Sequence, residues 1–119
     1  MTRQDESSKN AGRGQAAEFR RTIAAARDRL RTGLAGASDL PALAREVRTP
    51  LIKALMAFAG HPEGSRGQAW GSLAERATLA LEQAINEKDA NRVRRLVAEA
   101  EGRLAQVLGD MNSFGLSGA

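Results

Sequence analysis

The sequence contains no cysteine and no tyrosine, and it has one histidine, one tryptophan and three phenylalanines among its 119 residues. The absence of cysteine excludes disulfides, thiolate nucleophiles and cysteine metal sites. With so few aromatic rings, the core must come from Leu, Ala, Val and Ile, and little is left to stack on nucleic-acid bases. A single histidine supplies neither a metal-ligand set nor the oriented base of an enzyme. We therefore expect no catalytic residue, no metal and no cofactor.

Long apolar runs are also missing, and the amino terminus is too polar for a signal peptide. We expect a cytoplasmic protein that does not enter a membrane. At this length the chain makes one domain, which buries roughly two-thirds of its unfolded surface.

The segment 68–111 has the clearest pattern in the chain. In its second half, apolar residues recur at three- and four-residue steps and share one helical stripe: Val93, Leu96, Val97, Ala100, Leu104, Val107, Leu108 and Met111. The first half has a broad, alanine-rich apolar face that begins at Trp70, and Asp89 is placed to cap the second helix. The short connection at 86–89 makes the two helices antiparallel neighbours. Such a hairpin cannot cover its own apolar faces.

Upstream, residues 1–14 show no periodicity and are predicted to be a disordered segment, whereas 15–111 form a helical bundle domain. The first helix carries apolar residues at intervals of four and three: Phe19, Ile23, Ala26, Leu30 and Leu34. Gly33 and Gly36 are expected to end it. The predicted fold class is all-α: a compact bundle of four to five helices with a C-terminal antiparallel helical hairpin.

Two short helices are expected between the first helix and the hairpin. Ser38 and Asp39 can cap one that Pro41 begins, and the Thr49–Pro50 pair starts the next, which covers 51–59. This second short helix is apolar nearly all round, so it belongs in the middle of the bundle or under a partner. A loop at 60–67 follows it.

Residues 39–60 resemble a helix-turn-helix motif in Leu43, Ala44, Val47 and a turn at Thr49. The resemblance would imply DNA binding through residues 51–59. However, Arg48 stands where the turn requires glycine, and Lys53 is the one polar residue of the helix that would read the bases. Because reading base edges takes several donors and acceptors, we reject this interpretation.

The positive charge lies in the first half of the chain. Residues 1–60 contain eleven Lys or Arg against six Asp or Glu, and residues 61–119 contain seven against eight. Four arginines fall on one flank of the first helix, beside its apolar face, and we call them the arginine stripe: Arg13, Arg20, Arg27 and Arg31. The stripe is the expected site for an electrostatic partner.

The last helix carries small residues opposite its apolar stripe, at steps of four, three and four. We call this set the small-residue seam: Ala98, Gly102, Ala105 and Gly109. Glycine inside an exposed helix costs up to about 1 kcal/mol relative to alanine. The seam is therefore either a chance product of an Ala-rich chain or a place where a second helix packs closely, and Leu79 could join such a self-association contact.

Two further features have open interpretations. Residues 112–119 are either a flexible tail or a short anchor that docks Phe114 and Leu116 into a groove. The single histidine, His61, is interpreted as a solvated loop residue.

These observations favour a non-enzymatic protein-interaction module, a small regulator or adaptor that forms a homodimer and docks a protein partner. The alternative is sequence-independent binding of a nucleic-acid backbone through the arginine stripe, which salt would weaken steeply. A third alternative is an enzyme whose site is assembled between protomers.

Overall fold

Four helices make up the part of the chain that the structure describes. The computed structural model describes the backbone of residues 2–59 and 64–113, and the side chains of 16–58 and 67–113. The helices are α1 (Thr2–Gly36), α2 (Leu40–Ala59), α3 (Gly64–Asn86) and α4 (Ala90–Ser113). No strand occurs within these ranges. The prediction of a compact all-α bundle is confirmed, with four helices.

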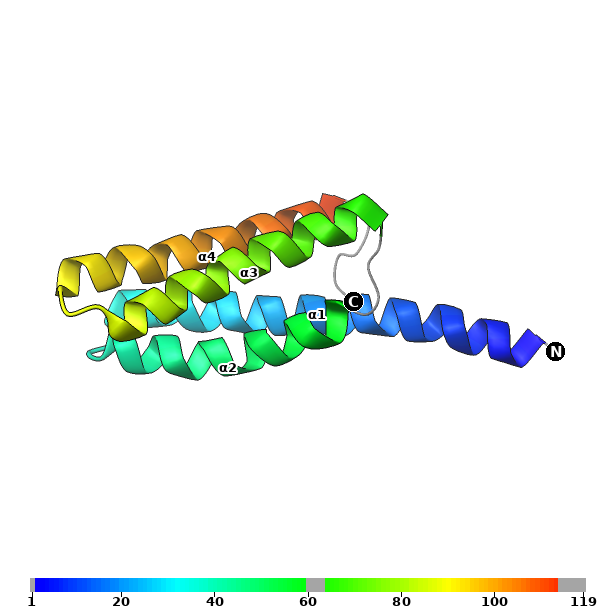
Figure 1. Ribbon diagram of the computed structural model, residues 1–119, viewed down its shortest axis with the longest axis horizontal. Coiled ribbons are helices and arrows are strands. Elements are labelled where there is room, and N and C mark those ends of the chain that lie inside the picture. The colour runs from blue at the N-terminus through cyan, green and yellow to red at the C-terminus, as the bar shows by residue number, and fades with distance from the viewer. Residues whose placement is uncertain (1, 60–63, 114–119) are drawn as a thin grey trace.

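The helices are arranged in a ring in the order of the sequence. Each packs against the helix that precedes and the helix that follows it, and α1 closes the ring against α4. The diagonal pair α2 and α4 touch only slightly. Figure 1 shows α3 and α4 side by side, with α1 and α2 beneath them and the first turns of α1 projecting past the bundle.

The core runs along the axis of the ring and receives side chains from all four helices. Its largest fully buried members are Ile23, Leu30, Leu51, Trp70, Leu81, Val97, Leu104, Val107 and Met111. The face of α3 beside them is lined by buried alanines, which lets neighbouring helices approach closely: Ala74, Ala77, Ala80 and Ala84. Nearly all of the apolar residues that recur at helical spacing in the sequence are buried in this core.

Two predicted helix starts are confirmed by their capping bonds. The Asp39 carboxylate accepts a hydrogen bond from the amide of Ala42 at 3.0 Å, and the Asp89 carboxylate accepts one from the amide of Asn91 at 2.9 Å. Each bond satisfies a donor that the first turn of a helix leaves without an intrahelical partner.

The predicted break at Thr49–Pro50 is wrong, because α2 is one helix with Pro50 inside it. Proline removes the bond to the Glu46 carbonyl and costs about 3 kcal/mol in a helix interior. Burial of Val47 and Leu51, on either side of it, offsets that cost. The Thr49 hydroxyl donates to the Arg45 carbonyl at 3.4 Å, the i−4 bond of a residue within a helix and not of an N-cap.

Two other helix boundaries also differ from the predictions, and the described α1 begins at Thr2. Gly33 lies inside α1 and does not end it. The helix α3 begins at Gly64, within the predicted loop, since burying Trp70 outweighs a glycine or two in the first turns.

Candidate functional site

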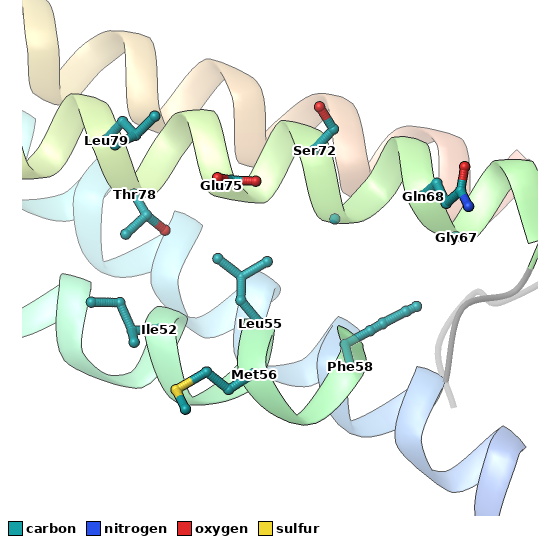
Figure 2. Close-up of a pocket in the computed structure, with 11 residues that line it drawn as sticks. Ile52, Leu55, Met56, Phe58, Gly67, Gln68, Ser72, Glu75, Thr78 and Leu79 are labelled. Carbon is teal, nitrogen blue, oxygen red and sulfur yellow. The ribbon is translucent and has the colours of Figure 1, made fainter. Parts of the chain in front are cut away.

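A groove with a volume of about 630 Å³ lies between the C-terminal half of α2 and the N-terminal half of α3. We call it the α2–α3 groove. The α2 wall consists of Ile52, Leu55, Met56 and Phe58, and the α3 wall consists of Gly67, Gln68, Gly71, Ser72, Glu75, Thr78 and Leu79. Figure 2 shows Leu55 pointing from α2 across the groove toward α3.

The groove holds both of the large hydrophobic side chains that are well exposed in the described part of the chain. Met56 on α2 is 74% exposed, and Leu79 on α3 is 49% exposed. Single exposed hydrophobic residues are common, but these two line the same groove. This is the feature that the structure adds to the sequence pattern.

The two walls differ in shape because their sequences differ. On α2 the wall is built from branched or long apolar side chains. On α3, Gly67 and Gly71 stand one turn apart, and a Cβ atom placed on Gly71 would meet no other atom within 4 Å. The hydroxyl of Thr78 donates to the Ala74 carbonyl at 2.9 Å, so its donor is satisfied within its own helix. One wall therefore projects and the other is recessed.

An aromatic cluster lies behind one end of the groove. Phe58 packs edge-on against Phe19 of α1, with ring centroids 4.3 Å apart and an interplanar angle of 76°. It also contacts Trp70 at a centroid distance of 6.4 Å. The Trp70 indole donates to the Asp110 carboxylate of α4 at 2.6 Å. All four helices therefore meet at this end, which fixes the position of the α2 wall.

Charged side chains stand around the groove on both helices. Arg45 is exposed on α2, and Glu75, Arg76 and Glu82 are exposed on α3, whereas Lys53 of α2 lines the hollow toward α1. One ion pair, Arg48 with Glu82 at 3.7 Å, links the two helices beyond the apolar part of the groove. Glu75 is the one titratable side chain among the lining residues.

The arginine stripe is not a free anion-binding surface where the structure describes it. Arg20 donates to the Asn112 side chain at 3.0 Å, and Arg27 pairs with Glu101 at 3.2 Å. Both partners are on α4. Arg31 is exposed, and the side chain of Arg13 lies outside the described residues. Half of the stripe therefore belongs to the border between α1 and α4, where Arg27 has an ion-pair partner and Arg20 is hydrogen-bonded to a neutral amide.

The small-residue seam faces outward on α4. Ala98, Gly102 and Gly109 are exposed and Ala105 is partly buried, and a Cβ atom on either glycine would meet nothing within 4 Å. No helix of the described chain packs there. The structure also does not bring Leu79 to the seam, because Leu79 lies in the α2–α3 groove.

Three other residues that the sequence analysis singled out lie outside the part of the chain that the structure describes. His61, Phe114 and Leu116 belong to residues that the structure does not describe. Within the described residues, no three His, Asp or Glu side chains gather in a way that could hold a metal ion. No helix in these ranges has the length and apolarity needed to cross a bilayer.

The sequence analysis did not predict the groove, although it recognised the unusually apolar α2 segment that forms one of its walls. It identified residues 51–59 as too apolar for a free helix and expected the bundle to enclose them. The structure instead places this segment at an outer corner, with Met56 in solvent. Finding the groove required knowing that α2 lies beside α3, with Gly71 opposite its apolar wall, and no local pattern contains that information.

No protein-family model matches the chain, and the searches of curated proteins and of solved structures likewise returned no match.

Proposed function

We propose that this protein is a non-enzymatic interaction module that self-associates and thereby acts as a small regulator or adaptor. The observation that supports this most directly is the pairing of exposed Met56 and Leu79 in one apolar groove. Fully burying a Met or Leu side chain contributes about 1.5–3 kcal/mol. A symmetric dimer buries each of them twice.

The strength of this association depends on how far the burial of these side chains exceeds the entropy that association costs. Association loses about 4–15 kcal/mol of translational and rotational freedom, together with side-chain entropy at the interface. Four buried hydrophobic side chains offset that cost with little to spare. The expected dimer is therefore weak, and these four side chains alone are too few to hold it together at micromolar concentration.

Sedimentation velocity over micromolar to millimolar protein concentrations tests the proposal. We expect the mean sedimentation coefficient to rise with concentration from that of a monomer toward that of a dimer. A coefficient that stays at the monomer value throughout this range would overturn self-association.

The structure weakens the case for the alternative function, nucleic-acid binding through the arginine stripe. Two of its four arginines already donate to α4, and releasing them would break contacts that close the bundle. Since each phosphate contact contributes to affinity and to its salt dependence, the remaining stripe makes a poor backbone site. We expect no retardation of duplex DNA or RNA at micromolar protein and low salt, and a salt-sensitive shift would revive the alternative.

A further inference from the structure

The two halves of α2 are held in the bundle in different ways. The first half, 40–50, buries four apolar side chains in the core: Leu40, Leu43, Ala44 and Val47. Ion pairs also bridge it to both neighbouring helices, with Arg29–Glu46 at 3.1 Å toward α1 and Arg48–Glu82 at 3.7 Å toward α3. The first half is therefore packed against the core along its length and bridged on both sides.

The second half, 51–59, which we call the arm, has much less to hold it. Leu51 at its start and Phe58 near its end are buried, and the residues between them are partly buried or exposed. Within the described part of the chain, the side chains of the arm form no ion pair or hydrogen bond with α1 or α3. The position of its far end therefore depends on Phe58.

Hollows lie on both sides of the arm, and Phe58 lines both of them. One is the α2–α3 groove, and Figure 2 shows its open space between Leu55 and Phe58 on α2 and the facing residues of α3. The other lies between α1 and α2, has a volume of about 380 Å³ and is lined by Phe19, Pro50 and Lys53 among others. Protein interiors are otherwise close-packed, so a helix between two hollows lacks many of the atoms that hold a helix in place.

The junction between the two halves has the chemistry of a helix hinge. Pro50 has no amide hydrogen, so the Glu46 carbonyl lacks the donor that a regular helix would provide. The Thr49 hydroxyl donates to the Arg45 carbonyl at 3.4 Å, and this kind of bond often bends a helix. The helix therefore misses a hydrogen bond at the point where its packing changes from tight to loose.

We propose that the arm pivots at Thr49–Pro50 and swings Phe58 out of the aromatic cluster while the rest of the bundle stays folded. At about 1.5 Å per residue the arm is about 13 Å long, and a change of about 20° in the bend moves its end by about 4–5 Å. Directed away from α1, this movement takes the Phe58 and Phe19 ring centroids from 4.3 Å to beyond the limit of about 7 Å for an aromatic pair.

Opening the arm changes the surface because Phe58 is the side chain that separates the two hollows. Its withdrawal joins them into one space, with the rings of Phe19 and Trp70 at the bottom. Both rings are buried in the closed form. The Nε1 atom of Trp70 donates to Asp110 in either form, so the exposed ring surface is apolar. The arm is thus a gate over an aromatic surface that the closed bundle hides.

Hydrogen exchange detects the opening, because a released arm does not remain helical. Isolated helices shorter than about 12–15 residues are marginal in water, so the amides of the arm exchange in each opening. NMR at concentrations where the monomer predominates should show the amides of 54–58 exchanging at one common rate. That rate should be about a hundredfold faster than for 43–47 and should depend more weakly on urea, since opening exposes less surface than unfolding.

Phe58→Ala tests the anchor and should accelerate exchange of 54–58 by about a hundredfold or more, because truncating a buried Phe weakens docking of the arm. Leu30→Ala is the matched control, since Leu30 is buried on α1 beside the first half of α2. It should accelerate amides that exchange by global unfolding by about thirtyfold or more but leave 54–58 unchanged. If Phe58→Ala prevents folding, Phe58→Leu should give a smaller acceleration in the same direction.

Pro50→Ala tests the hinge. It supplies the amide that the Glu46 carbonyl lacks and should slow exchange of 54–58 by about thirtyfold or more. Pro41→Ala makes the same substitution in the first turn of α2, which stays folded when the arm opens, and should leave the exchange of 54–58 unchanged.

The pattern of rates decides between the arm and simpler motions. A common rate that responds to Phe58 and Pro50, but not to Leu30 or Pro41, establishes the hinged arm. Equal rates in both halves of α2 under every variant would show that the helix opens as one piece and would overturn the hinge. Rates that rise steadily toward the end of α2 and ignore Pro50→Ala would show fraying, and they too would overturn it.

Discussion

Arg27 shows how a charged residue on a helix surface depends on the helix beside it. Its position just outside the apolar face of α1 marks it as a border residue, like the charged positions that flank the seam of a coiled coil. From the sequence, the same position is equally compatible with a solvent-exposed anion site. The structure places Glu101 of α4 beside it at 3.2 Å, which makes Arg27 part of a helix–helix border.

Gly33 has a packing role that its sequence context conceals. It lies buried inside α1, and a Cβ atom built on it would overlap Cδ2 and approach Cγ of Leu43 on α2. Gly33→Ala should therefore lower the free energy of unfolding by about 1–3 kcal/mol, because the added methyl group overlaps the buried Leu43 side chain, which must move within a packed core. Urea unfolding followed by circular dichroism measures the change.

Gly102→Ala is the matched control for that variant, since it makes the same change at a helical position with open space around it. It should raise the unfolding free energy by up to about 1 kcal/mol through helix propensity alone. If both substitutions stabilised the protein equally, close packing at Gly33 would be disproved.

At the scale of the element, local chemistry predicts the capped helix starts well, but it does not predict where a helix continues through a proline or a glycine. Asp39 and Asp89 were identified from the sequence because a cap depends on residues within one turn. The prediction of a break at Thr49–Pro50 was wrong because the packing of Val47 and Leu51 decides whether the helix continues. Those contacts are made with other helices. Gly33 failed as a helix end for the same reason.

Pro50 provides the test at this scale. Pro50→Ala restores the bond to the Glu46 carbonyl and removes the helix-interior penalty of about 3 kcal/mol. It also returns about 0.4–1 kcal/mol of conformational freedom to the unfolded chain. We expect a net gain of about 2–2.6 kcal/mol in the free energy of unfolding, measured by urea titration.

Pro41→Ala should have the opposite sign. Pro41 lies in the first turn of α2, where its missing amide has no intrahelical partner to lose. The change therefore acts only through the unfolded chain and should cost about 0.4–1 kcal/mol. Stabilisation by both substitutions would show that the helix-interior position of Pro50 is not the cause.

For the molecule as a whole, the sequence predicted the class of fold but not which surface remains exposed. Periodicity identifies the buried stripes, and the core residues of α4 lie where its stripe predicts them. The order of helices around the ring follows from short connections, which favour neighbours. The sequence pattern does not determine how each helix is rotated about its own axis. That rotation decides which flank of α2 lies against α3, and hence where Met56 points.

The ring order also has a consequence for how fast the bundle assembles. Contacts between α1 and α2, α2 and α3, or α3 and α4 join segments connected by short loops, whereas Arg27–Glu101 and Arg20–Asn112 join residues separated by 74 and 92 positions. Because closing a long loop costs more chain entropy, we expect the α1–α4 border to form after the rate-limiting step.

Glu101→Gln should then accelerate unfolding while leaving the refolding rate nearly unchanged, whereas Leu81→Ala, at the α3 core, should slow refolding as well. Stopped-flow chevron plots of the two variants, recorded at protein concentrations where the monomer predominates, distinguish these behaviours. Equal slowing of refolding by both would mean that the two ends of the chain meet early.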